Sequence, residues 1–531
     1  MSEDLRVARH AGTVGAATLL SRVLGLVREQ VMATLFGAGF ATDAFNVAFR
    51  IPNLLRDLFA EGAMSSAFVP TFTEVLKTKG EIEAWRLGRQ LFWALGLVLV
   101  GVCGVGWVFA PVLVQLFAPG FAGVAGKLEL TVTLTRVMLP FLPAVALAAV
   151  AMGMLNARGR FGVPALAPAM LNVGMVAGGL ALIPLCRASG QPAILAMALG
   201  VLIGGLAQLL FQLPALHAEG FRFRLEPPRL HPGVLRVAAL MGPAVVGLAA
   251  TQINQLVSTV IASLLVQGSV SWLGYAFRLM QLPIGVFGVA LATVSLPGLA
   301  RAAVDRDMPA LKTTLSSALR LVFALTFPAS LWLALMARPV IALLYEHGRF
   351  GSHDTAQTAG ALLMYCLGLP AFAAVGVLTR AFYALGETRT PVRSSFVAVA
   401  VNLALNLLFV GPLRFLGLEH RGLALATSAT AVVNLLQLAW FLRRRIGPLE
   451  GRRMLQTVRG AALGSAIGLA PSGIALWLLG ERWHGGWARE ASLVAASLVT
   501  SLALGWWAMR LLKVRELPAL EQLVTGVLRR R

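Results

Sequence analysis

The sequence has few charged residues, fewer acids than bases, and almost no cysteine. Only 13% of its 531 residues are charged, and 23 acids are outnumbered by 45 lysines and arginines. Together with 58% hydrophobic residues and a mean hydropathy of +0.78, this excludes an ordinary soluble globular domain. Cys103, Cys186 and Cys366 have no ligand spacing, so neither a disulfide framework nor a metal site is predicted. The composition predicts an integral membrane protein.

Apolar runs long enough to cross a bilayer core of about 30 Å recur along the whole chain. We predict an all-α polytopic membrane protein with fourteen transmembrane helices and no large domain outside the membrane. The predicted spans are residues 10–36, 42–74, 88–117, 130–155, 163–185, 192–216, 235–266, 271–300, 312–344, 355–385, 392–413, 422–442, 455–479 and 489–512.

The distribution of lysine and arginine over the predicted connections indicates the orientation. With the N-terminus inside, twenty of these residues lie in cytoplasmic connections and seven, Lys127 among them, in the opposite ones. Both termini are therefore predicted to be cytoplasmic. The net charge of +22 lies mostly in these cytoplasmic connections. We interpret it as a means of attraction to anionic membrane lipid and not as a sign of nucleic-acid binding.

Two landmarks indicate an internal repeat. Ala48-Phe49-Arg50 recurs as Ala276-Phe277-Arg278, and Pro164 has a counterpart in Pro391, at offsets of 228 and 227 residues. An offset of six helices gives both copies the same topology, which predicts two parallel lobes with a binding site at their interface. The predicted parts are residues 1–216 for the N-lobe, 217–445 for the C-lobe, and 446–531 for a last helix pair with a basic tail.

Polar residues follow helical spacing on three of the predicted spans. On the second span they form one seam, so this face is not expected to contact lipid. Pro52 predicts a kink or a break beside the seam. Arginines inside apolar spans are costly and mark functional sites by default. The candidate substrate-binding residues are Arg22 and Arg28 on the first span, Asp43, Arg50, Asn53, Arg56 and Glu61 on the second, and Ser271 and Arg278 on the eighth.

Two interpretations of these arginines remain open. In the first, they form ion pairs that hold packed helices together, with Arg22 paired to Glu29 and with Arg50 and Arg56 paired to Asp57 or Glu61. In the second, they form a binding surface for an anion. The eighth span contains Arg278 but no acid, which favours an anionic ligand. The planar guanidinium suits the oxygens of phosphate or diphosphate groups. No cofactor and no metal are predicted.

Several motifs carry a resemblance to a known family. They are Ser21-Arg22 to Arg28, Phe36-Gly-Ala-Gly, Ala41-Thr-Asp43, Pro52-Asn53 to Arg56, Phe59-Ala-Glu61, Ser271-Trp with Arg278-Leu-Met, and Thr390-Pro391-Val. With these motifs the chain resembles the MurJ (MviN) lipid II flippases of the MOP superfamily. The resemblance implies a two-lobed carrier with a cationic central cavity and a groove for a polyprenyl tail beside the last two helices.

The implied function is transport, without enzymatic activity, of the lipid-linked peptidoglycan precursor lipid II across the bacterial inner membrane by alternating access. Arg22, Arg28 and Arg278 would contact the diphosphate. The alternative is a MOP-type exporter of another polyprenyl-diphosphate-linked glycan or of another amphiphile. Phe277 and Gln281 stand where the family pattern has acids. Residues 253–262 of the seventh span also lack the acid that forms part of a sodium site in some family members, so the hypothesis does not include sodium coupling. Expected partners are lipid II, membrane lipids and cell-wall synthesis enzymes, and we expect a monomer.

Overall fold

The structure is a computed structural model that describes residues 3–57, 63–224, 231–483, 486–518 and 521. These residues form helices and turns and contain no β-strand. Nine of their helices are long and apolar enough to cross a membrane, or ten if the bent pair Ser352–Cys366 and Leu369–Ala384 forms one span. The all-α membrane fold is confirmed, whereas the count of fourteen spans stays a prediction.

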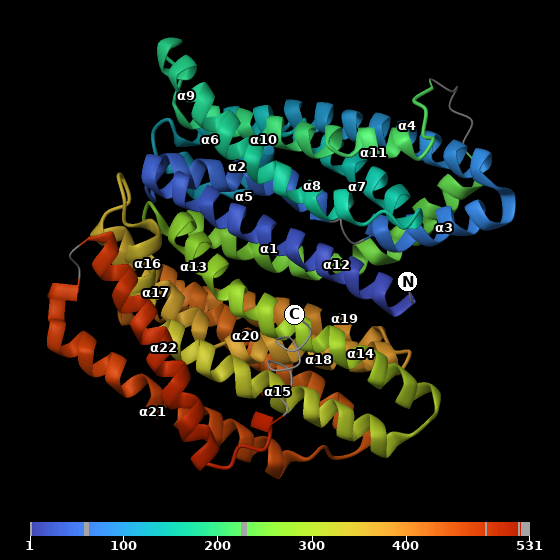
Figure 1. The fold of residues 1–531 in the computed structure, drawn as a ribbon. Helices are drawn as coiled ribbons and strands as arrows, with labels where there is room; N and C mark the ends of the chain where they lie inside the picture. Colours follow the sequence, from blue (N-terminus) through green and yellow to red (C-terminus); the bar gives the residue numbers. More distant parts are fainter. Residues whose placement is uncertain (1–2, 58–62, 225–230, 484–485, 519–520, 522–531) are drawn as a thin grey trace. The chain divides into compact units, whose positions relative to one another are not determined.

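The helices form two compact units, Met1–Ser271 and Trp272–Arg531, and α13 (Ser269–Pro283) runs from the first into the second (Figure 1). Unit 1 contains α1 (Glu3–Phe36), α2 (Phe40–Arg56), α3 (Ala63–Lys79), α4 (Glu81–Val108), α5 (Ala110–Phe117), α6 (Lys127–Met138), α7 (Phe141–Ala157), α8 (Gly162–Val173), α9 (Gly179–Ala188), α10 (Ile194–Leu210), α11 (Leu213–Ala218) and α12 (Pro232–Ser263).

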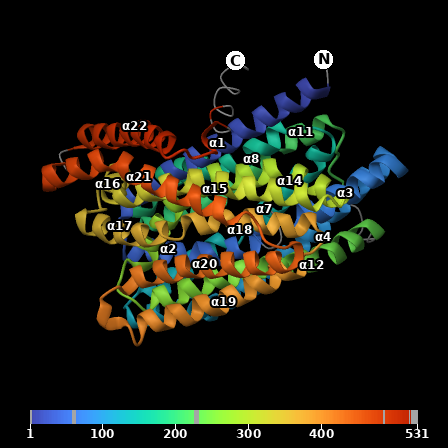
Figure 2. The ribbon, with the colours of Figure 1, turned by 90° about the horizontal axis from the view of Figure 1, so that it is seen from below.

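Unit 2 continues from α13 with helices that are long on average and joined by short connections. They are α14 (Val289–Val304), α15 (Met308–Leu335), α16 (Ala337–Tyr345), α17 (Ser352–Cys366), α18 (Leu369–Ala384), α19 (Arg389–Val410), α20 (Glu419–Ile446), α21 (Gly451–Leu479) and α22 (Trp487–Leu511). Figure 2 shows α19 beside α20 and α21 beside α22, two pairs that are also packed in the structure.

Each of the fourteen predicted ranges overlaps one or more of these helices. In the second range, α2 is assigned through Arg56 and α3 begins at Ala63, while residues 58–62 lie outside the described part of the chain. Pro52 lies inside α2, and the kink expected there stays a prediction. The lobe boundaries drawn from the repeat also stay a prediction. In the structure the seventh predicted span, α12, packs on α3 and belongs to unit 1.

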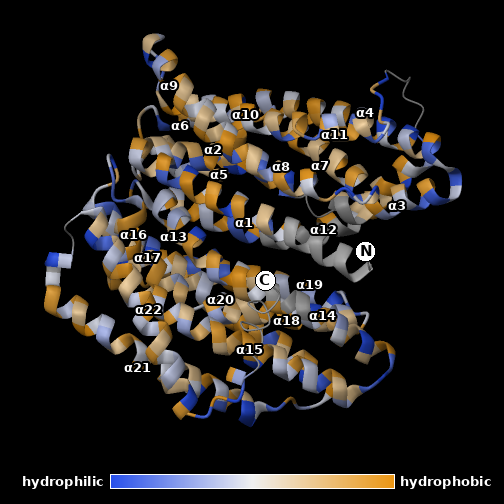
Figure 3. Cartoon of the chain, in the orientation of Figure 1, coloured by the Kyte–Doolittle hydropathy of each residue, from blue (hydrophilic) through white to orange (hydrophobic). Residues whose placement is uncertain are grey.

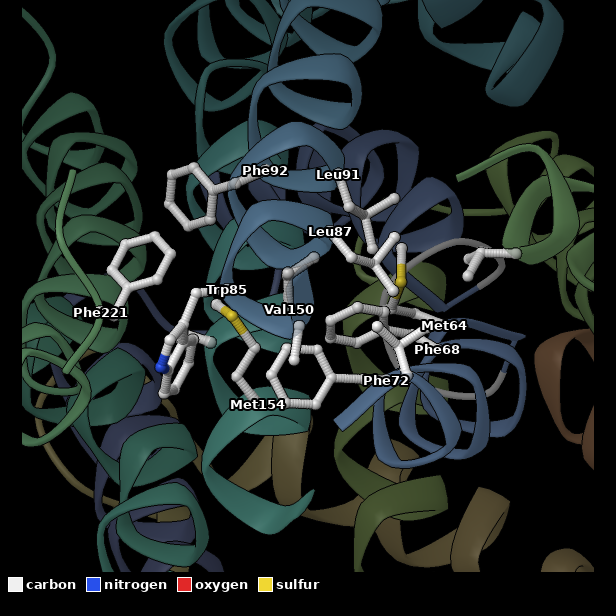
Figure 4. Packing of buried hydrophobic residues seen from close by; sticks show 14 of the residues in the cluster. Met64, Phe68, Phe72, Trp85, Leu87, Leu91, Phe92, Val150, Met154 and Phe221 are labelled. Atoms are coloured by element: carbon white, nitrogen blue, oxygen red, sulfur yellow. The ribbon is translucent and has the colours of Figure 1, made fainter. Parts of the chain in front are cut away.

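An aromatic cluster joins α3, α4 and α7 in unit 1 (Figure 4). Phe72 and Trp85 lie edge to face with ring centroids 5.6 Å apart, and Trp85 contacts Phe221 in the same way at 5.9 Å. Met154 packs beside them in the same cluster. Because lipid is as apolar as these side chains, close van der Waals packing, rather than exclusion of water, holds such helices together.

Glycines let the last two helices approach closely. Gly460, Gly464 and Gly468 are spaced by four residues along one face of α21, and a Cβ at Gly468 would lie 2.7 Å from the backbone of Gly505 on α22. Small residues at this spacing are typical of helix contacts in membranes.

Other helix faces are apolar and exposed, as expected for contact with lipid. Leu97, Val98 and Val105 on α4 are each more than 60% exposed. Figure 3 shows hydrophobic residues along the helices and hydrophilic ones gathered in the connections. This surface supports the predicted membrane environment.

Candidate functional site

Asp43 occupies a buried ionic site at the start of α2, although the sequence suggested a role on a cavity face. Its carboxylate is 1% exposed and lies 2.9 Å from the Nζ atom of Lys127, the first residue of α6. Lys127 is 2% exposed, and its ammonium group lies 4.2 Å from the ring centroid of Phe121. The sequence assigned Lys127 to a connection on the outer side; the structure makes it the first residue of α6 with a buried side chain, and its side of the membrane stays a prediction. The lysine is drawn inside because it neutralises a buried carboxylate.

The same carboxylate holds the start of α13. Its Oδ2 atom accepts a hydrogen bond from the backbone N–H of Gly268 at 2.8 Å. Its Oδ1 atom accepts from the backbone N–H of Ser271 at 3.0 Å and from the Ser271 hydroxyl at 2.6 Å. A carboxylate from another helix therefore caps the N-terminus of α13, where unpaired N–H groups and the helix dipole favour a negative charge. Ser271 is fully buried as part of this cap.

Arg28 on α1 is paired inside unit 1. Its Nε and Nη2 atoms donate to Glu29 at 3.0 and 2.6 Å, and its Nη1 atom donates to Asn172 of α8 at 2.9 Å. The structural interpretation paired Glu29 with Arg22, whereas in the structure this carboxylate accepts hydrogen bonds from Arg28. Arg22 lies six residues earlier on the same helix and is exposed.

The C-terminal end of α2 contacts α12 through Asp57, the residue after the helix. Arg56 donates to Asp57 at 2.9 Å, as the structural interpretation expected. Asp57 also accepts hydrogen bonds from Asn53 at 3.4 Å and from Gln252 of α12 at 3.2 Å. Arg50 is half-buried on the same helix. The predicted seam therefore faces protein at this level, and Glu61 lies outside the described residues.

Arg278 lies on α13 in unit 2, one turn before the exposed Gln281, and is half-buried. The helix segment Ser269–Pro283 carries no acid, so the sequence feature that singled Arg278 out persists in the fold. The helices α1, α2 and α13 thus each carry basic and amide groups that can donate hydrogen bonds to an anion.

The predicted cytoplasmic connections of unit 1 meet at one end, at the right of unit 1 in Figure 1. Arg158, after α7, bonds to Glu81 at 2.5 Å and to Glu219 at 3.2 Å, and Arg160 bonds to Glu219 at 2.6 Å. The hydrogen bond from Arg160 lowers the pKa of Glu219, with a further contribution from Arg158. Three connections predicted to share one side of the membrane are therefore in contact.

Comparison with known proteins identifies the family. A family model described as "Lipid II flippase MurJ" matches residues 32–497. A lipid II flippase MurJ from Burkholderia cenocepacia is 40% identical over 444 residues, covering 82% of this chain and 83% of the relative. The chain belongs to the lipid II flippase MurJ family.

Solved structures agree with MurJ membership. The structure titled "Lipid II flippase MurJ, inward closed conformation" is 25% identical, covers 94% of this chain and 98% of its own, and has a TM-score of 0.76. An inward-facing MATE family transporter of the MOP superfamily is 16% identical, covers 82% of this chain and 98% of its own, and has a TM-score of 0.65. The second match shows the shared fold alone.

Sequence reasoning missed three partners of the candidate site residues. Lys127, Asn172 and Gln252 supply contacts to Asp43, Arg28 and Asp57, respectively. Gln252 and Asn172 are polar residues within apolar spans, which is a usable signal. Lys127 gives no such signal because it begins a helix after a short connection. Arg320, inside the predicted span 312–344 without an acid nearby, was also detectable and is paired in unit 2.

Proposed function

We propose that this chain carries lipid II, an undecaprenyl-diphosphate-linked peptidoglycan precursor, from the inner to the outer leaflet of the bacterial inner membrane. The observation that carries the proposal is the match to the lipid II flippase MurJ family over four fifths of both chains. The mechanism we propose is alternating access. The chain acts as a transporter and not as an enzyme.

We assign each arginine a role that follows from its surroundings. Arg22 is exposed, and its planar fork makes the first contact with the diphosphate. Arg28 lies about 9 Å further along α1, where Glu29 and Asn172 hold its guanidinium in position for a later contact with the diphosphate. Arg278 supplies a second cation on α13, and Arg50, Asn53 and Arg56 support the path along α2. We give Glu61 the same supporting role from its sequence motif alone.

Asp43 and Ser271 have a positioning role in this proposal. They hold the N-terminus of α13, seven residues before Arg278, and so fix the start of the helix that carries this arginine. The direct contact with substrate expected from the sequence is not needed for this role, because both side chains are buried in mutual hydrogen bonds.

Both termini and the basic connections are proposed to lie on the cytoplasmic side. The ion pairs that join these connections in unit 1 support a common side. An inside-negative potential then favours export of an anionic headgroup by about 2.3 kcal/mol per charge and 100 mV. The membrane potential therefore drives the cycle in this proposal without a dedicated cation site, and the protein works as a monomer.

The test is transport of fluorescent lipid II in vesicles that contain the purified protein. We expect Arg22→Ala and Arg278→Ala to lower the rate at least about tenfold, because each removes charge-assisted hydrogen bonds. The Arg→Lys variants should recover only part of the rate, since lysine lacks the bidentate fork. The exposed Arg301→Ala, outside the predicted site, is the matched control and should transport normally.

Two outcomes would contradict the proposal. Normal transport by both alanine variants at equal protein levels would mean that the arginines have only a structural role. An unchanged rate with and without an imposed potential would remove the electrical driving force. Competition by other polyprenyl diphosphates would test the alternative cargo, which requires that they displace lipid II equally well.

A further inference from the structure

Unit 2 contains a cationic pocket that is lined by none of the residues assigned to the transport site. It has a volume of about 610 Å³ and lies between α15, the first turns of α21 and the segment that follows α22. Four arginines and one lysine line it, with Glu516 as the acid among the lining residues. A volume of this size is typical of small-molecule sites.

An ionic network connects several of the residues that line the pocket. Arg320 of α15 donates from Nε to Glu516 at 2.8 Å and from Nη1 to Glu450, and Arg453 also donates to Glu450. Glu516 accepts a further hydrogen bond from Thr457 at 3.0 Å and is 7% exposed. These contacts join three separate segments, α15, the start of α21 and the segment after α22, so part of the pocket lining is held in place by hydrogen bonds.

Three further cations that line the pocket are exposed. Arg459 lies on α21, and Lys513 and Arg515 lie on the segment after α22. The two acids of the network already neutralise Arg320 and Arg453, so these three residues leave the pocket strongly positive. Such a pocket attracts an anion that can accept several hydrogen bonds, such as phosphate.

The backbone holds Lys513 in a conformation that usually requires glycine. Its φ is +54°, and the bonds from Lys513 N to Arg510 O and from Val514 N to Met509 O close the end of α22. Glycine is the common residue at such a helix end because a Cβ is strained there. A lysine at this position is thermodynamically unfavourable for the fold, which points to a use for its side chain in the pocket.

Apolar residues lie beside the cations. Leu463 and Leu512 line the same pocket and are 56% and 42% exposed. Gly460 allows the segment after α22 to approach, since a Cβ there would lie 2.5 Å from Val514. A site lined by both cations and exposed leucines fits an amphiphile better than a free anion.

We propose that this pocket binds the phosphate headgroup of an anionic phospholipid. Arg459, Lys513 and Arg515 bind the phosphate oxygens, and Leu463 and Leu512 contact the first carbons of the acyl chains. The pocket lies at the end of unit 2 that we assign to the cytoplasm, so the lipid comes from the inner leaflet. The site is independent of the arginines assigned to lipid II.

The experiment measures lipid adducts on the full-length protein in neutral detergent by native mass spectrometry. The probes are dioleoyl phosphatidylglycerol, dioleoyl phosphatidylcholine and glycerol 3-phosphate. We expect phosphatidylglycerol to bind at least about tenfold more tightly than the other two, and the Arg459→Gln/Lys513→Gln/Arg515→Gln variant to lose this difference. The matched control, Arg301→Gln/Arg393→Gln/Arg452→Gln, removes three exposed arginines outside the pocket and should retain it.

Lys513→Gly separates binding from folding. It relieves the strained conformation, so the thermal stability should be equal or higher while the affinity for phosphatidylglycerol falls several-fold. Equal loss of binding in both triple variants would overturn the proposal, because general surface charge would then explain it. Equal binding of phosphatidylcholine, or of glycerol 3-phosphate, would also overturn it. Unchanged lipid II transport by Lys513→Gly would show that this site is separate from the transport site.

Discussion

The two ends of unit 1 are held by ionic contacts that differ in their exposure to solvent. Where α2 and α6 begin, Asp43 and Lys127 form a pair that is almost completely buried. At the other end, Arg160 and Arg236 are 70% and 56% exposed in their pairs with Glu219 and Glu74. The first kind of pair is costly to form and costly to break, whereas the second is screened by water and salt.

This difference indicates how each end serves the molecule. The buried end fixes Gly268 and Ser271, where the chain leaves unit 1 through α13. A single geometry is required there, because the carboxylate has no water to replace a lost partner. The exposed end joins connections through several interchangeable pairs, so it can tolerate change.

The largest effect is expected from Asp43→Ala. This substitution leaves Lys127 charged and buried and removes three hydrogen bonds from the start of α13. The loss of stability should be about 3–5 kcal/mol. It can be measured by denaturant unfolding of the purified protein in detergent with tryptophan fluorescence as the signal.

Lys127→Met should cost less than Asp43→Ala, because the carboxylate keeps its three other donors. The double variant should lose clearly less than the sum of the two single losses. A strictly additive double variant would show that the two residues are not coupled, and the contrast between the ends would fail.

The sequence predicted the seam of α2 but not its partners. Polar residues spaced by three and four residues had to share a face, and the structure brings Asn53 and Asp57 together on α2. Helical periodicity carries this information because it depends on near neighbours. The contacts from Asp43 to Lys127, 84 residues away, depend on how α2 and α6 pack, and no local pattern encodes that.

The arginines show the same limit. Their position within apolar spans predicted that they need partners, which is correct for Arg28 and Arg56. The choice between Arg22 and Arg28 as the partner of Glu29 depends on rotamers and on Asn172 of α8, which sequence spacing does not specify. Burial of charge was therefore predictable, whereas the identity of each partner was not.

An intermediate effect is expected from Glu219→Gln, and it should depend on pH. The folded pKa of Glu219 is lowered below its ordinary value of 4.5 by the hydrogen bond from Arg160. Its stabilisation is therefore complete above about pH 4.5 and is lost as the pH falls through the folded pKa. We expect the variant to lose roughly 1 kcal/mol at about pH 7, and this loss to shrink when the pH is lowered below about 4.5.

The measurement is the melting temperature of both proteins across this pH range at one salt concentration. A difference that stays constant to the lowest pH would mean that the carboxylate charge contributes nothing. Arg158 bonds to Glu81 as well as to Glu219, so part of the network remains in the variant. The predicted loss is moderate for that reason.

The smallest effect is expected from Arg236→Gln, which removes the pair between α12 and Glu74 of α3. Both side chains are more than half exposed, so water replaces the lost contact and added salt weakens the original one. The change in unfolding free energy should stay within about 0.5 kcal/mol, and Arg236→Glu should remain below about 1 kcal/mol despite the like charges. A loss from Arg236→Gln as large as that from Asp43→Ala would mean that α12 depends on this pair for its place in unit 1. The two ends would then be equally rigid, and exposure would no longer predict which ionic contacts the fold requires.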